Sequence, residues 1–255
     1  METMELIAAG LPVRLRLRFR ATRRYFEEFI FPPERASTVA EDAWLDLPAL
    51  ELHELALEQK RLGGDVAFAE HSLLIESFAN PVLRYDRFLF HGAAFRWQGK
   101  ALILTGLSGV GKTTQLRHWR SQFGGEIELI SGDKPLIEVR GGEFFVHPSP
   151  WTGKEREQGT VSAPLGGIVL LEQGSENSMR PLPMSEAVYP LFLQFLYRPT
   201  DRESLELVCG YEEKLLSLVP VWKLVNRGDP ESAALCYHTL KEDGRWATAS
   251  ATASS

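Results

Sequence analysis

The stretch Ala-Leu-Ile-Leu-Thr-Gly-Leu-Ser-Gly-Val-Gly-Lys-Thr-Thr, residues 101–114, decides the fold of this chain. An apolar run at 101–104 leads into glycines at positions 106, 109 and 111, and Lys112 and Thr113 follow the last glycine at once. This is the pattern of a phosphate-binding loop between a strand and a helix. The sequence therefore predicts a strand over 101–104 and a helix over 113–123, joined by a loop that binds a nucleotide.

Each residue type in this loop has a chemical reason. Glycines let the backbone turn its N–H groups toward an anion, and the first turn of the following helix adds a positive end. Lys112 is expected to reach the outer phosphates, and Thr113 can be a ligand of Mg²⁺. The residues predicted to bind the nucleotide are Gly106, Ser108, Gly109, Val110, Gly111, Lys112, Thr113 and Thr114.

Composition narrows the class of protein. With 255 residues, of which 44% are apolar and 24% charged, the chain can bury a large core. A net charge of -6 gives no positive field for nucleic acid, so we expect no nucleic-acid partner. No window reaches the roughly 18 apolar residues of a membrane span, and the first residues lack the basic segment of a signal peptide, so we expect no membrane partner. Two cysteines without metal-type spacing favour a reducing, cytoplasmic location.

The pattern of apolar residues divides the chain into three parts. We expect an N-terminal α+β subdomain over 1–85, a nucleotide-binding and catalytic domain over 86–246, and a disordered tail of Ala, Ser and Thr over 247–255. In the first part, residues 13–20 alternate between apolar side chains and arginines, which predicts an edge strand with solvated charges. Helices are expected over 21–29, 50–62 and 68–79.

The second part mixes strand and helix patterns. Strands are expected over 88–97, 126–130 and 166–171, with a hairpin formed by 136–140 and 143–146 and an extended segment over 220–224. Helices are expected over 185–196, 204–218 and 231–241. Together with the phosphate-loop strand and helix, this predicts an α/β fold whose β-sheet carries the loop.

The carboxylate best placed to act on a bound nucleotide is Asp133, which follows the strand expected at 126–130. In phosphate-loop folds, a carboxylate at the end of a neighbouring strand faces the metal and the outer phosphate. Asp133 can therefore bind Mg²⁺ or accept the proton of an attacking hydroxyl. The alternative is that Asp133 serves only the turn that it forms with Lys134 and Pro135.

Two further positions can contribute to this chemistry. The proline-rich loop at 147–156 contains Lys154 and Arg156, whose charges can meet a transferring phosphate or remain solvated. His91 precedes the phosphate-loop strand and is either a hydrogen-bonded structural histidine or a residue of the site. The sequence contains no zinc-ligand spacing and no Gly-x-Ser-x-Gly pattern, which leaves phosphoryl transfer as the expected reaction.

Together, these motifs resemble the HPr kinase and phosphoenolpyruvate carboxykinase superfamily over residues 85–240. The resemblance rests on His91-Gly92, the loop from Gly106 to Thr114, Ser131-Gly132-Asp133-Lys134-Pro135, and Pro150-Trp151-Thr152-Gly153-Lys154. The pattern is most similar to the stand-alone HPr-kinase-like proteins encoded with modified-peptide pathways. It implies a mixed sheet that carries the phosphate loop, ATP with Mg²⁺, and transfer of the γ-phosphate to a hydroxyl, commonly a serine of a peptide or small protein.

The resemblance also implies roles for individual residues. Lys112 is expected to hold the β- and γ-phosphates, and Thr113 to bind the metal. Asp133 is expected to bind the metal or to take the acceptor proton. Lys154 is expected to contact the phosphate during transfer, and His91 to line the same site.

The chain departs from the family pattern at one position. The family usually has two adjacent aspartates where this chain has Gly132-Asp133, so one carboxylate remains for two tasks. Metal binding is then the role expected for Asp133, because phosphoryl transfer depends more on positioning and charge neutralisation than on a strong base. The alternatives are a nucleotide-binding module without turnover and a small-molecule kinase. A homo-oligomer is compatible with the sequence.

Overall fold

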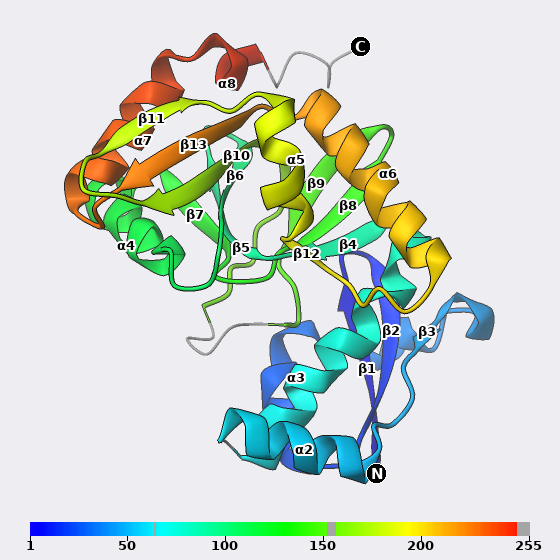
Figure 1. Cartoon of the computed structure of the whole chain (residues 1–255). Coiled ribbons are helices and arrows are strands. Elements are labelled where there is room, and N and C mark those ends of the chain that lie inside the picture. The colour runs from blue at the N-terminus through cyan, green and yellow to red at the C-terminus, as the bar shows by residue number, and fades with distance from the viewer. Residues whose placement is uncertain (64, 152–156, 249–255) are drawn as a thin grey trace.

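Two β-sheets of unequal size organise the chain (Figure 1). The computed structural model describes residues 1–63, 65–151 and 157–248, and within them the chain has a mixed α/β fold. A three-stranded sheet and its helices form an N-terminal layer, and a ten-stranded mixed sheet carries the rest. No helix in these three ranges is long and apolar enough to cross a bilayer.

The ten-stranded sheet is the centre of the fold. Its strands are β4 (Arg87–Phe90), β5 (Gly92–Trp97), β6 (Lys100–Thr105), β7 (Ile127–Ser131), β8 (Leu136–Arg140), β9 (Glu143–His147), β10 (Ala163–Gln173), β11 (Ser178–Pro181), β12 (Phe195–Leu196) and β13 (Val221–Asn226). Strand β6 is buried along its whole length and lies between β10, which runs parallel to it, and β5, which runs antiparallel. The continuous apolar sequence of β6 suits this position, because both of its faces are covered.

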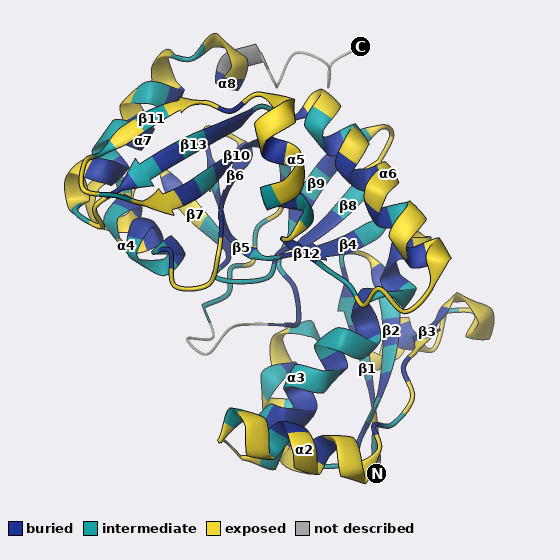
Figure 2. Cartoon of the chain, in the orientation of Figure 1, coloured by how far each residue is buried: buried dark blue, intermediate teal, exposed yellow. Residues whose placement is uncertain are grey.

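Helices cover both faces of this sheet (Figure 2). They are α4 (Lys112–Phe123) and α7 (Pro230–Glu242) on one face, and α5 (Met184–Phe192) and α6 (Arg202–Leu218) on the other, with the short α8 (Gly244–Thr248) following α7. Successive side chains of β6 enter opposite cores, Ile103 on the side of α5 and α6 and Leu104 on the side of α4 and α7. The sheet is therefore buried between two layers of helices.

The N-terminal layer shares a hydrophobic core with the large sheet. Its elements are β1 (Glu2–Ala8), β2 (Leu11–Leu17), β3 (Leu45–Asp46), α1 (Pro33–Ala36), α2 (Leu52–Leu62) and α3 (Val66–Ala79). Leu89, Leu136 and Trp151, which follow the N-terminal layer in the sequence, belong to the same cluster of buried side chains as its own apolar residues. The indole of Trp151 is fully buried, with its ring centroid 4.0 Å from that of Phe78 in α3. This shared core fixes the layer against the sheet.

Aspartates define the starts of three helices. Asp65 caps α3, Asp201 caps α6 and Asp229 caps α7, each by accepting a hydrogen bond from a backbone N–H in the first turn. Helix α4 differs, because its N-cap is Gly111 and no side chain within the described residues caps it. The N–H groups of its first turn are the ones that the sequence assigns to a phosphate.

Residues 13–20 are predicted to form a strand at the edge of a sheet, and the edge position is wrong. Strand β2 lies between β1, its antiparallel partner, and β3, its parallel partner. Its arginines are ion-paired, with Arg14 contacting Glu5, Glu41 and Asp46. Strand pairing with residues 45–46 is a long-range contact, so the alternation within 13–20 could not indicate it.

Three other predicted elements differ in their bounds. Residues 88–97 form two strands that part at His91, because β4 pairs with β8 while β5 pairs with β6. The helix expected over 185–196 ends at Phe192, and Phe195–Leu196 pairs with β4 as strand β12. The helix expected over 21–29 is a pair of 3₁₀ helices, η1 (Arg20–Tyr25) and η2 (Glu27–Phe29).

The predicted tail at 247–255 is wrong at its first two residues. Helix α8 continues to Thr248, which includes the first two residues of the predicted tail. Residues 249–255 lie outside the described part of the chain. Strands and helices occur at the other predicted positions.

Candidate functional site

Three strand ends meet at one edge of the large sheet. Strands β6 and β7 end at Thr105 and Ser131, and β5 runs antiparallel between them, beginning at Gly92. Because β5 has the opposite direction, its start lies beside the ends of both neighbours. The segments collected at this edge are His91, the glycine-rich loop Gly106–Lys112, and Asp133 with Lys134.

Hydrogen bonds join these strand ends. The Thr105 hydroxyl donates to the His91 carbonyl at 2.6 Å, and the Gly92 N–H donates to the Asp133 carbonyl at 2.8 Å. The backbone around the site is therefore held by the strand pairing of the sheet and also by these two further hydrogen bonds.

The glycine-rich loop has a backbone that glycine alone adopts without strain. Gly106, Gly109 and Gly111 have φ of 136°, 81° and 105°. A Cβ at Gly106 would also lie 2.9 Å from the carbonyl oxygen of Leu171 in β10. The side-chain amide of Gln173 donates to the Gly109 carbonyl at 3.1 Å, so the end of β10 supports the loop. Ser108 is exposed, and Thr113 and Thr114 are half-buried in the first turn of α4.

Lys112 is buried and its ammonium group faces back over the loop. It donates to the carbonyls of Gly106 at 2.9 Å and Leu107 at 3.1 Å. Burial lowers the pKa of Lys112, the charge of Asp133 opposes this shift, and the charge of Lys134 adds to it. Lys112 is therefore within electrostatic reach of both residues that follow β7.

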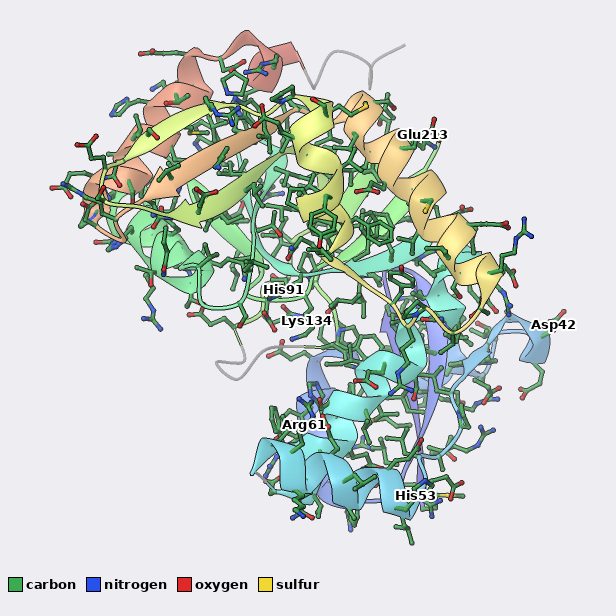
Figure 3. The ribbon with its side chains drawn as sticks, in the orientation of Figure 1. Asp42, His53, Arg61, His91, Lys134 and Glu213 are labelled. Carbon is green, nitrogen blue, oxygen red and sulfur yellow. The ribbon has the colours of Figure 1, made fainter. Side chains whose placement is uncertain are left out.

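His91 lies beside Asp133. Its Nε2 is 3.6 Å from a carboxylate oxygen of Asp133, and both side chains are about three-quarters buried, with 24% and 26% exposed. Burial lowers the pKa of His91, and the charges of Lys112 and Lys134 add to this while Asp133 opposes it. The ring is therefore held toward its neutral form. Figure 3 shows His91 and Lys134 close together at the sheet edge that faces α3.

Asp133 is shared between a histidine and a lysine. Its second carboxylate oxygen forms an ion pair with Lys134, the next residue in the chain. The side chain of Lys134 is 20% exposed. Asp133 thus meets two partners that compete with any metal ion for its oxygens.

The surroundings of Gly132 leave no room for a side chain. A Cβ at this position would lie 2.9 Å from both the Cβ and the carbonyl oxygen of Glu157, and the Gly132 N–H donates to that carbonyl at 2.9 Å. The side chain of Glu157 forms an ion pair with Arg120 of α4 at 2.9 Å. An aspartate at position 132 therefore has no room unless the segment at 157–159 moves.

A magnesium ion at this edge would need a nucleotide to complete its ligands. No group of three or more His, Cys, Asp or Glu in residues 1–63, 65–151 and 157–248 could hold a metal by itself. Mg²⁺ usually keeps several waters and binds one or two carboxylates together with substrate phosphates. Asp133 and the Thr113 hydroxyl provide oxygen donors of this kind.

The predicted cationic loop lies only partly within the described chain. Lys154 and Arg156 fall outside the described residues. The preceding Ser149 donates its hydroxyl to the Lys134 carbonyl at 2.5 Å, and the following Gln158 forms an isolated bridge with Ser131. Both flanks of the loop therefore contact the segment that carries Asp133.

The structure adds residues that the sequence did not single out. The sequence names Lys134 only within a turn and within the motif at 131–135 and predicts no role for it, yet its ammonium group lies at the site. Gln194, just before β12, accepts the His91 backbone N–H at 2.8 Å with its carbonyl, and its side chain is buried beside that histidine. The proximity of Gln194 depends on β12 pairing with β4, for which the sequence holds no local signal.

Comparisons with known proteins leave the chain without a family assignment. No protein-family model matches it, and no curated protein matches it. One of the solved structures that it matches is the HPr(Ser) kinase/phosphatase of Coxiella burnetii, at 10% identity over 61% of this chain and 99% of that chain, with a TM-score of 0.26. Likeness at this level assigns no function, so the function below is inferred from the residues of the site.

Proposed function

We propose that the chain is a kinase that uses ATP and Mg²⁺ to transfer the γ-phosphate to a hydroxyl group, on a serine of a peptide or small protein. One observation carries the proposal. The glycine-rich loop leads into the uncapped start of α4 at the same sheet edge as His91 and Asp133. An anion-binding loop beside a carboxylate is the arrangement that phosphoryl transfer requires.

The loop and Lys112 bind the phosphates. Backbone N–H groups of Gly109, Gly111 and the first turn of α4 receive the anion, and the positive end of the α4 dipole adds to its affinity. Lys112 exchanges its two loop carbonyls for the β- and γ-phosphates. Burial of its ammonium group strengthens this interaction, because water competes less in a low dielectric.

Thr113 and Asp133 would hold the metal. When bound, Mg²⁺ neutralises charge on the transferring phosphate. Asp133 is fixed for this task through its backbone carbonyl, which accepts from Gly92. Lys154 would contact the phosphate during transfer, as the motif resemblance implies.

In the reaction, the acceptor hydroxyl oxygen forms a bond to the γ-phosphorus while the bond from that phosphorus to the bridging oxygen of ADP breaks. The hydroxyl proton passes to Asp133 or to the neutral ring of His91. A weak base suffices, because the transition state is largely dissociative and the proton is lost late. The peptide acceptor comes from the motif resemblance.

A second candidate function is a nucleotide-binding module without turnover. Two observations favour it: the ion pair between Asp133 and Lys134, and the contact that leaves no room for a carboxylate at Gly132. Such a module would bind ATP through Lys112 but transfer nothing.

Transfer of label from γ-labelled ATP separates the two functions. We would incubate the purified chain with Mg²⁺ and peptides that carry a single serine, with Lys112→Ala as the blank and Lys60→Ala as a matched control on the exposed face of α2. A kinase labels a peptide with the wild type and Lys60→Ala but not with Lys112→Ala. ATP binding without label in any peptide supports the module, and absence of ATP binding in the wild type contradicts both.

A further inference from the structure

Lys134 is a second cation at the site and has no role in the function described so far. It follows Asp133 at the end of β7, whereas Lys112 follows the glycine-rich loop at the end of β6. The two strands are separated by β5, and two inter-strand spacings amount to about 10 Å. The lysines therefore approach the same edge from opposite sides.

The backbone is held at Lys134 and at the next residue, Pro135. The Ser149 hydroxyl donates to the Lys134 carbonyl at 2.5 Å, and the Phe90 N–H donates to the Pro135 carbonyl at 3.1 Å. A lysine on a fixed backbone can move its ammonium group by side-chain rotation while the attachment point stays in place. Lys134 can thus leave Asp133 for another anion without a change in the fold.

The charges at the edge are unequal. Among the described residues, Lys112 and Lys134 bring two positive charges, the neutral His91 brings none, and Asp133 is the carboxylate that interacts with all three. Glu157, beside Gly132, is ion-paired with Arg120 and adds no net charge. The start of α4 adds a partial positive charge. This excess occurs in a chain whose net charge is -6, so the edge suits a ligand with several negative charges.

We propose that Lys134 binds the γ-phosphate of ATP from the side opposite to Lys112. This rests on the proposed function. Lys112 lies over the loop, which receives the inner phosphates, and the triphosphate extends from there toward the end of β7. Lys134 then contacts the outermost phosphate, and Asp133 is left free for the metal.

The alternative for Lys134 is a structural ion pair with Asp133. Such a pair would stabilise the turn and would not distinguish ATP from ADP. A contact with the γ-phosphate predicts the opposite, because ADP lacks that group. Comparing the two nucleotides therefore separates ligand contact from a structural role.

The test is the equilibrium dissociation constant of ATP and of ADP, each with Mg²⁺, for the wild type, Lys134→Gln, Lys134→Arg and the control Lys60→Gln. We expect Lys134→Gln to weaken ATP binding about tenfold, as for the loss of one charge-assisted hydrogen bond, and to change ADP binding less than about twofold. Lys134→Arg keeps the charge and should retain most of the preference for ATP. Lys60→Gln should bind both nucleotides as the wild type does.

Two outcomes overturn the inference while leaving the proposed function intact. Lys134→Gln could weaken ATP and ADP equally, which would mean that Lys134 supports the loop and not the γ-phosphate. It could also leave both affinities unchanged, which would mean that the ion pair is inert. A wild type that binds neither nucleotide overturns the proposed function itself, and the inference with it.

Discussion

The N-terminal layer and the edge of the large sheet both gather charged side chains, but they balance them differently. In the layer, Arg14 meets Glu5, Glu41 and Asp46 at 3.3, 2.6 and 3.4 Å, and Arg16 meets Asp46 at 3.1 Å. At the edge, Lys112 and Lys134 act on the single carboxylate of Asp133. In the layer two arginines face three carboxylates, whereas at the edge two lysines face one carboxylate, so the excess charge at the edge is positive and suits an anionic ligand.

The largest effect should come from removing the cation of the loop. Lys112→Ala is expected to lower ATP affinity about 100-fold, on the order of 3 kcal/mol, because charge-assisted hydrogen bonds to two phosphates are lost. Titration calorimetry would measure this against Lys60→Ala. An affinity within about threefold of the wild type would contradict the assignment of the loop.

Asp133 should affect transfer more than binding. Asp133→Ala is expected to slow phosphoryl transfer about 100-fold or more while ATP affinity changes less than tenfold, because a metal ligand acts chiefly in the transition state. Single-turnover kinetics with labelled ATP would measure the transfer step. If the variant and the wild type transferred phosphate at the same rate, Asp133 would serve only the turn that it forms with Lys134 and Pro135.

Adding a carboxylate at position 132 should not speed phosphoryl transfer. Gly132→Asp is expected to destabilise the chain by about 1–3 kcal/mol, because its Cβ would lie 2.9 Å from atoms of Glu157. Thermal unfolding would register this as a lower midpoint, and transfer should not increase. The matched control is Gly125→Asp, since a Cβ at that position meets nothing within 4 Å. Faster transfer by Gly132→Asp would contradict the steric account.

His91 should make stability depend on pH. Its pKa is lowered from the ordinary 6.5, so below that pH the unfolded chain takes a proton that the folded site resists. The free energy of unfolding should therefore fall as the pH drops from about 7.5 to about 5.5, and His91→Gln should reduce this fall. His147, whose pKa burial also lowers, accounts for part of the remaining slope. Denaturant titrations that gave both proteins the same slope would contradict the shift at His91.

The smallest effect on binding should come from the N-terminal layer. Arg14→Ala is expected to lower the midpoint of thermal unfolding and to change ATP affinity less than about twofold, since its carboxylate partners lie in the N-terminal layer. Thermal unfolding would measure the midpoint, and titration calorimetry would measure the ATP affinity of Arg14→Ala beside that of Lys112→Ala. A loss of ATP affinity comparable to that of Lys112→Ala would remove the distinction between the two regions.

The loop could be predicted because its information is local. Gly106 to Thr113 are contiguous, and each of the three glycines has a positive φ that the turn of the loop itself requires. Asp133 could be proposed as a neighbour because it follows a strand that comes after the loop helix. Asp133 lies beside His91 because β5 runs antiparallel between β6 and β7. The order of strands in a sheet depends on long-range contacts, so no single segment of the sequence predicts it.

The remaining features depend on contacts between distant residues. The position of β2 depends on β3, about thirty residues later, and the end of α5 depends on β12 pairing with β4. Gly132 carries no sequence signal for its contact with Glu157. The sequence predicts no separate role for Lys134 because a lysine before a proline is typical of a turn, and its proximity to Lys112 and Asp133 depends on the fold.

Hydrogen exchange with and without ATP and Mg²⁺ tests the central claim most directly, because it locates the ligand along the backbone. We predict slower exchange in peptides that cover residues 105–114 and 131–134, and unchanged exchange in those that cover residues 11–17 of β2. Unchanged exchange at 105–114, or protection centred on the N-terminal layer, would contradict the claim that the unequal charges at the sheet edge bind the nucleotide.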